Sequence, residues 1–155
     1  MNLIEIISRY QKEVADKSIL VEYELFFKNI IEKNCKFVLD DIVQLEKLNN
    51  VILKIKEKDI DSEIYVNTYG IDFMDEEVCI YADTLWINTV IDLEEILGFF
   101  KYFQDIEPSD IILLSEPEMI DGMVELVVLT DCEVENYESF IKKRELSKMK
   151  SLYLD

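Results

Sequence analysis

The stretch CIYADTLWINTVIDLEE, from Cys79 to Glu95, predicts a strand that runs directly into a helix. Apolar and β-branched residues dominate its first part, as in a buried strand. Asp92, followed by Glu95 three residues later, matches a capping box and predicts the start of the helix. Because a strand this apolar has to be covered by other elements, we expect the stretch to form the centre of the fold.

Asp83 lies in the most apolar part of this strand and needs an explanation. Strict alternation would divide the strand into one face with Cys79, Tyr81, Asp83, Leu85 and Ile87, and an opposite face with Ile80, Ala82, Thr84, Trp86 and Asn88. Two interpretations of Asp83 remain open. It is a carboxylate at a strand edge on a binding face, or a buried group hydrogen-bonded to Thr84, Thr89 or a backbone amide.

The rest of the chain divides into a helical first part and a mixed second part. Apolar residues at steps of three and four predict helices over 2–17, 18–34 and 39–58, although 18–34 and 51–58 also allow a strand. Period-two patterns predict strands at 62–70, 77–89, 110–115 and 124–130, and the first two form a hairpin. An apolar stripe follows Asp92, and an amphipathic pattern from Glu135 onward predicts a C-terminal helix.

These elements predict one α+β domain over residues 1–155. N-terminal helices precede a mainly antiparallel sheet of about four strands, with a central capped helix and a C-terminal helix. The start of the sequence has no signal-peptide pattern, and no apolar run approaches the length of a membrane span. Cys35, Cys79 and Cys132 are few and widely spaced, which favours reduced thiols and a cytoplasmic protein.

Acidic residues are concentrated in one part of the chain. The formal net charge is −18, yet residues 1–58 contain ten acidic and ten basic side chains. Residues 59–138 contain twenty-two acidic side chains and one basic side chain, Lys101, whereas 139–155 contain two acidic and five basic ones. Such asymmetry indicates a functional acidic face that selects its partner by charge, because solubility alone requires far less charge.

The residue types required for most catalytic sites are missing. The chain has no histidine, and its three glycines cannot build a phosphate-binding loop. This excludes most hydrolases, dehydrogenases and kinases, and we expect neither a cofactor nor a catalytic residue. The carboxylates of residues 72–77 offer oxygen ligands for a divalent cation, but they lack the calcium-loop spacing, so a solvated turn is favoured over a metal site.

The same charge distribution argues against direct binding to nucleic acid, since phosphates are bound by clusters of lysine and arginine. The one basic run, Lys142 to Arg144, is interpreted as a partner of the helix dipole. Tyrosines interleaved with carboxylates are typical of a surface that meets arginine and lysine on another protein. The predicted partner-binding residues are Tyr69, Asp72, Asp75, Glu76, Glu77, Tyr81, Asp83, Glu116, Glu118 and Asp121.

In its size, acidity, lack of histidine and α+β pattern around the ADTLWINT strand, the chain resembles bacterial toxin-immunity proteins of the contact-dependent inhibition and polymorphic toxin type. The resemblance implies an inhibitor that binds a basic toxin effector, often a nuclease, and it assigns no individual residue. Two alternatives stay open. One is a regulatory or adaptor protein that mimics nucleic acid, and the other is a carboxylate enzyme that uses a divalent metal.

Overall fold

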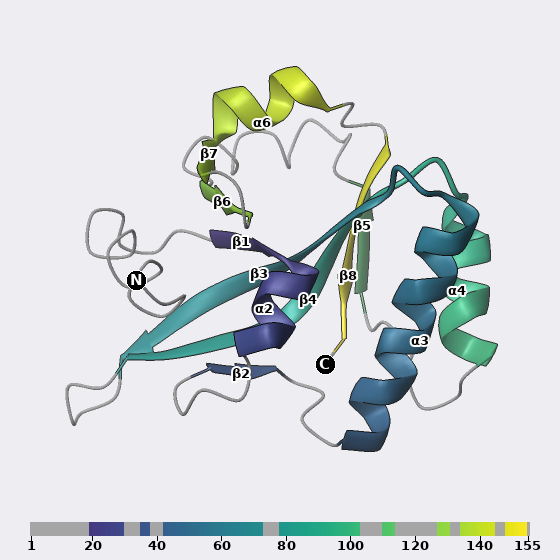
Figure 1. Ribbon diagram of the computed structural model, residues 1–155, viewed down its shortest axis with the longest axis horizontal. Coiled ribbons are helices and arrows are strands. Elements are labelled where there is room, and N and C mark those ends of the chain that lie inside the picture. Colours follow the sequence, from purple (N-terminus) through teal and green to yellow (C-terminus); the bar gives the residue numbers. More distant parts are fainter. Residues whose placement is uncertain are drawn as a thin grey trace.

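The computed structural model describes residues 19–29, 35–37, 42–72, 78–102, 110–113, 127–130, 134–144 and 148–154. Within these ranges the chain forms one continuous sheet with helices on both of its faces (Figure 1). The helices are α2 (Tyr23–Asn29), α3 (Ile42–Lys58), α4 (Leu93–Tyr102) and α6 (Tyr137–Lys143). The strands are β1 (Ile19–Glu22), β2 (Cys35–Phe37), β3 (Glu63–Asp72), β4 (Val78–Asn88), β5 (Asp110–Leu113), β6 (Val127–Leu129), β7 (Val134–Asn136) and β8 (Met149–Tyr153).

The predicted α+β class with a mainly antiparallel sheet is confirmed. The strand order is β5-β8-β4-β3-β1-β6-β7, and β2 pairs with β4 beside this path. Among the described strand pairs, β1–β6 and β2–β4 are parallel and the others are antiparallel. The four expected strands are present as β3, β4, β5 and β6, and four short strands extend the sheet to eight. The expected hairpin is the ladder between β3 and β4, which runs from Glu63–Asn88 to Asp72–Val78.

Two segments show which of the alternatives left open by the sequence is formed, and the C-terminal helix differs from the prediction. The segment 18–34, expected as a second helix, contains strand β1 and, after it, helix α2 from Tyr23 to Asn29. The alternating segment 51–58 is helical throughout, because Val51, Ile52 and Ile55 form the buried side of α3. The C-terminal helix is shorter than predicted: α6 ends at Lys143, and β8 then fills the position between β4 and β5. The predicted helix at 2–17 lies outside the described residues.

A β-bulge in the hairpin decides which side chains of β4 reach the main core. Asn67 is opposite Thr84 and Thr68 is opposite Ala82, so Asp83 has no residue opposite it on β3. The extra residue reverses the alternation, and Ala82 therefore joins Leu85 and Ile87 in one core cluster. Strict alternation, which placed Ala82 on the opposite face from Leu85, is wrong at this point.

The main core lies between the sheet and the helices α2, α3 and α4. Sheet residues such as Val66 and Leu85 pack with Ile52 and Ile55 of α3 and with Phe100 of α4, all fully or almost fully buried. Figure 1 shows α3 and α4 side by side. Each buried Leu, Ile or Phe side chain contributes about 1.5–3 kcal/mol relative to an exposed one, so this contact holds the two long helices in place.

The opposite face of the sheet is covered by α6. Tyr65 of β3 and Phe140 of α6 are buried and meet edge to face, with ring centroids 5.7 Å apart. Trp86 lies opposite Tyr65 in the β3–β4 ladder and is also buried. Both faces of the central hairpin are therefore covered, which explains the apolar character of β4. None of the helices within the described ranges is long and apolar enough to cross a membrane.

Candidate functional site

Among the described residues, three of the predicted binding residues, Tyr69, Asp72 and Tyr81, lie toward the end of the β3–β4 ladder that is formed by Asp72 and Val78. The strand register places Tyr69 directly opposite Tyr81, and Asp72 opposite Val78 in the last pair before the turn. The carboxylates expected in this turn, Asp75, Glu76 and Glu77, lie outside the described residues. So do Glu116, Glu118 and Asp121. Strand β5, which precedes the 116–121 group in the chain, ends at Leu113. Leu113 pairs with Lys150 of β8, and Lys150 pairs with Ile87 of β4, so β5 ends near the opposite end of the hairpin.

Asp83 is buried, with 8% of its surface exposed. Its Oδ1 accepts a hydrogen bond of 2.8 Å from the hydroxyl of Thr84, and its backbone carbonyl accepts one from the amide of Leu154. Of the two interpretations from sequence, the structure therefore shows the buried, hydrogen-bonded group. Asp83 also marks the point where one edge of β4 changes partner from β2 to β8.

Removal of the Thr84 hydroxyl tests this role. We expect Thr84→Val to lower the free energy of unfolding by about 1–3 kcal/mol, because the carboxylate of Asp83 would stay buried without its donor. Asp83→Asn retains an oxygen acceptor for Thr84 and should change stability by less than about 1 kcal/mol. Urea denaturation of both variants measures the difference. Equal stability of Thr84→Val and the wild type would show that the hydrogen bond contributes nothing.

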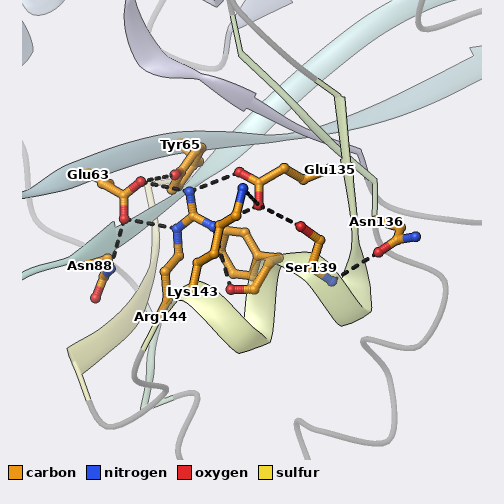
Figure 2. A network of polar contacts seen from close by, with 9 residues as sticks. Glu63, Tyr65, Asn88, Glu135, Asn136, Ser139, Lys143 and Arg144 are labelled. Atoms are coloured by element: carbon orange, nitrogen blue, oxygen red, sulfur yellow. Dashed lines mark hydrogen bonds and ion pairs between the residues drawn. The ribbon is translucent and has the colours of Figure 1, made fainter.

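The most extensive polar cluster surrounds Arg144, just after α6 (Figure 2). Its Nε and Nη2 donate to the two carboxylate oxygens of Glu63 at 2.9 and 2.8 Å. Its Nη1 and Nη2 donate to the carboxylate oxygens of Glu135, both at 3.1 Å. The guanidinium also lies 4.3 Å from the centre of the Phe140 ring. Arg144 thus joins β3, β7 and the end of α6 through two bidentate ion pairs.

The surroundings of Glu63 favour the charged form of its carboxylate. Burial opposes ionisation of Glu63, but hydrogen bonds from Arg144, Tyr65 and Asn88 outweigh it and lower its pKa. Burial also raises the pKa of Tyr65, and Glu63 raises it further. For Arg144, the bonds to Glu63 and Glu135 outweigh burial and raise its pKa. Arg144 is therefore the counter-ion of Glu63 and Glu135, and its contacts hold β3 and β7 to the end of α6.

The pKa shift of Glu63 predicts a specific acid sensitivity. Because the folded state lowers its pKa below the ordinary 4.5, Glu63 contributes stability above that pH, and this contribution is lost as the pH falls through the lowered value. We expect Glu63→Gln to be less stable than the wild type at pH 7 and to lose less stability between pH 6 and pH 3. Denaturant titrations across this range measure both slopes. Parallel slopes would contradict the assignment.

The Arg144 cluster is not among the sites predicted from the sequence. The interpretation of Lys142 to Arg144 as a helix-dipole group fits Lys142 and Lys143, which lie exposed in the last turn of α6. Arg144 instead turns inward, and its side chain is only 10% exposed. Its partner Glu63 is 81 residues away. No local spacing rule can reveal such a pair, since only the sheet brings β3 and β7 under α6.

A second polar cluster joins two neighbouring loops, 59–62 and 89–92. Oδ2 of Asp59 accepts hydrogen bonds from the Thr89 hydroxyl at 2.6 Å and the Val90 amide at 3.2 Å. The Thr89 hydroxyl lowers the pKa of Asp59 more than its slight burial raises it. On the other side, the buried Lys150 donates from Nζ to the carbonyls of Thr89 and Lys148 at 2.9 and 3.2 Å. Burial lowers the pKa of Lys150, and Asp92 and Asp59 oppose that change.

The start of α4 lies beside this cluster. The backbone carbonyl of Asp92 accepts from the amides of Glu95 and Ile96, so the helix begins where the sequence predicts. The Glu95 carboxylate, however, forms an ion pair with Lys58 of α3 instead of the reciprocal bond of a capping box. A shallow cleft of about 370 Å³ lies between the two helices and is lined by Lys54, Glu57, Lys58, Glu95 and Phe99.

Among the described residues, no group of three or more acidic or cysteine side chains is arranged to hold a metal ion. Comparison of the chain with models of known protein families, with curated proteins and with solved structures finds no match. The candidate functional surface therefore rests on the chain's own charges and geometry.

Proposed function

We propose that this chain is an immunity-type inhibitor, which binds a basic toxin effector in the cytoplasm and neutralises it through an acidic face. The observation that carries the proposal is the charge distribution: twenty-two acidic side chains and one basic side chain over residues 59–138. A nuclease effector has to hold phosphates, so its active site is basic. An acidic protein accelerates its own encounter with such a site and opposes its electrostatic field.

The ion pairs of the fold support this interpretation. Lys58 pairs with Glu95, and Lys143 and Arg144 pair with Glu135 and Glu63. In these pairs, bases from the flanking segments are matched with acids of the 59–138 segment. The pairs involve only a few of the twenty-two acidic side chains, so the segment keeps a large excess of negative charge. Self-repulsion of this kind weakens a fold, and a basic partner would relieve it.

The test is protection in living cells. The product of the neighbouring gene, which the proposal requires to be a basic effector, is produced under an inducible promoter, with or without this chain. We expect the wild-type chain to restore growth, and Glu76→Gln with Glu77→Gln to reduce protection. A matched control neutralises two exposed acids of the charge-balanced part, Glu24→Gln with Glu46→Gln, and should protect like the wild type.

Two outcomes would contradict the proposal. The first is growth arrest that the wild-type chain does not relieve, although both proteins are produced in soluble form. The second is equal protection by the Glu76/Glu77 variant and the wild type in cells and in a binding assay. Inhibition of a housekeeping DNA-binding protein in place of the encoded effector would support a nucleic-acid mimic, and heat release on titration with Mg²⁺, Mn²⁺ or Ca²⁺ would support the metal enzyme.

A further inference from the structure

Two aliphatic side chains project into solvent from the neighbouring loops 59–62 and 89–92. Ile60 is 89% exposed and Val90 is 65% exposed. Asp59 precedes Ile60 in the chain and binds the amide of Val90, so the two loops adjoin. Isolated exposed aliphatic residues are common on protein surfaces, but an adjoining pair at the meeting point of two loops is a candidate contact patch. We call Ile60 and Val90 the apolar pair.

The frame beneath the apolar pair is held by hydrogen bonds from several directions. Asp59 binds both Thr89 and Val90 through Oδ2, and its Oδ1 accepts from the amide of Asp61 at 3.2 Å. The amide of Thr89 donates to the carbonyl of Lys148, and the Thr89 carbonyl accepts from Lys150. A contact patch on so constrained a frame loses little conformational entropy on binding.

Exposed carboxylates lie close to the apolar pair along the chain. Asp61, Asp92 and Glu94 lie on the same two loops and the first turn of α4, and all three are exposed. The nearby cations of the described residues are engaged: Lys58 pairs with Glu95, Lys148 attracts Asp59, and Lys150 is buried against carbonyls. An apolar centre with an acidic rim is complementary to an apolar side chain flanked by lysine or arginine.

We infer that the apolar pair and its rim, Asp61, Asp92 and Glu94, form one contact site of the acidic face for the basic effector. The inference rests on the proposed function and adds to it a contact site that lies outside the hairpin end predicted from sequence. In this arrangement the carboxylates steer the encounter, and the apolar pair limits dissociation by excluding water from the centre of the contact.

The experiment compares affinities of the chain and its variants for the purified product of the neighbouring gene, which the proposed function requires to be a basic effector. Ile60→Ser with Val90→Ser should weaken binding about tenfold or more, as expected for truncation at the centre of an interface. Val134→Ser is the matched control, because Val134 is also exposed, at 52%, but lies on β7. It should change affinity less than about twofold. Thermal unfolding of each variant confirms that the exposed substitutions leave the fold intact.

The outcomes separate this inference from the proposed function. Unchanged affinity of the Ile60/Val90 variant, with a wild-type chain that binds, overturns the docking site and leaves the proposed function standing. Equal weakening by Val134→Ser also overturns it. Failure of the wild-type chain to bind the effector overturns both. Sedimentation analysis of the chain alone adds a further check: a dimer that Ile60→Ser with Val90→Ser dissociates would assign the patch to a second copy and overturn the inference.

Discussion

Arg144→Met is expected to destabilise the fold by about 3–5 kcal/mol, the range found when one partner of a buried ion pair is removed. Methionine retains an aliphatic stem against Phe140, so the substitution removes mainly the charge and its hydrogen bonds. Glu135, which is 2% exposed on its side chain, would then remain buried without its bidentate partner. Urea denaturation at pH 7 measures the loss.

The pH dependence of this loss identifies its cause. In the variant, the pKa of Glu63 rises, because burial still opposes its charge and Arg144 no longer offsets that effect. Protonation relieves the penalty, so the difference between the variant and the wild type should be smaller at pH 5 than at pH 7. A difference that stays constant with pH would indicate lost packing, with no contribution from the charge.

A double variant provides the control. Glu135→Leu with Arg144→Met removes the buried pair together and leaves Glu63, which is partly exposed and keeps Tyr65 and Asn88 as donors. We expect the double variant to be more stable than Arg144→Met alone, since a buried ion pair can be replaced by apolar residues at little cost. A loss equal to the sum of the two single variants would show that the residues act independently.

The sequence predicts the elements of the fold better than their junctions. The long elements α3, α4 and the β3–β4 hairpin have enough apolar residues in a regular pattern to be identified from the sequence. Their apolar side chains are required because these elements pack in the core. The short strands β1, β2, β7 and β8 have three to five residues each, too few to show a period. Their strand conformation comes from backbone pairing with β3, β4 and β6, which a local pattern does not contain.

The β7 segment shows why the Arg144 cluster escapes prediction. Hydropathy would bury Val134 and expose Glu135, whereas the structure exposes Val134 and buries Glu135. The inversion follows from Arg144, which compensates the buried carboxylate through two hydrogen bonds. Asp83 is a similar case. Its burial depends on a bulge that shifts the register, and no residue of the CIYADTLWINT strand signals that bulge.

Electrostatic steering gives the second large expected effect. Between about 0.01 M and 1 M salt, the Debye length falls from about 30 Å to about 3 Å. At the high-salt end of this range, the acidic segment therefore no longer attracts a basic partner over distances longer than direct contact. We expect the association rate constant with the effector domain to fall by a factor on the order of 10–1000 across this range. Glu76→Gln with Glu77→Gln should lower the low-salt rate and flatten the salt dependence, whereas Glu24→Gln with Glu46→Gln should change neither.

In the proposed function, negative charge on residues 59–138 drives recognition of a basic protein. Stopped-flow measurement of the association rate constant at increasing salt, with the wild-type chain and the basic effector domain, tests this claim most directly. We expect a steep decrease as salt rises, with a dissociation rate that changes far less. An association rate constant that is independent of salt would contradict it.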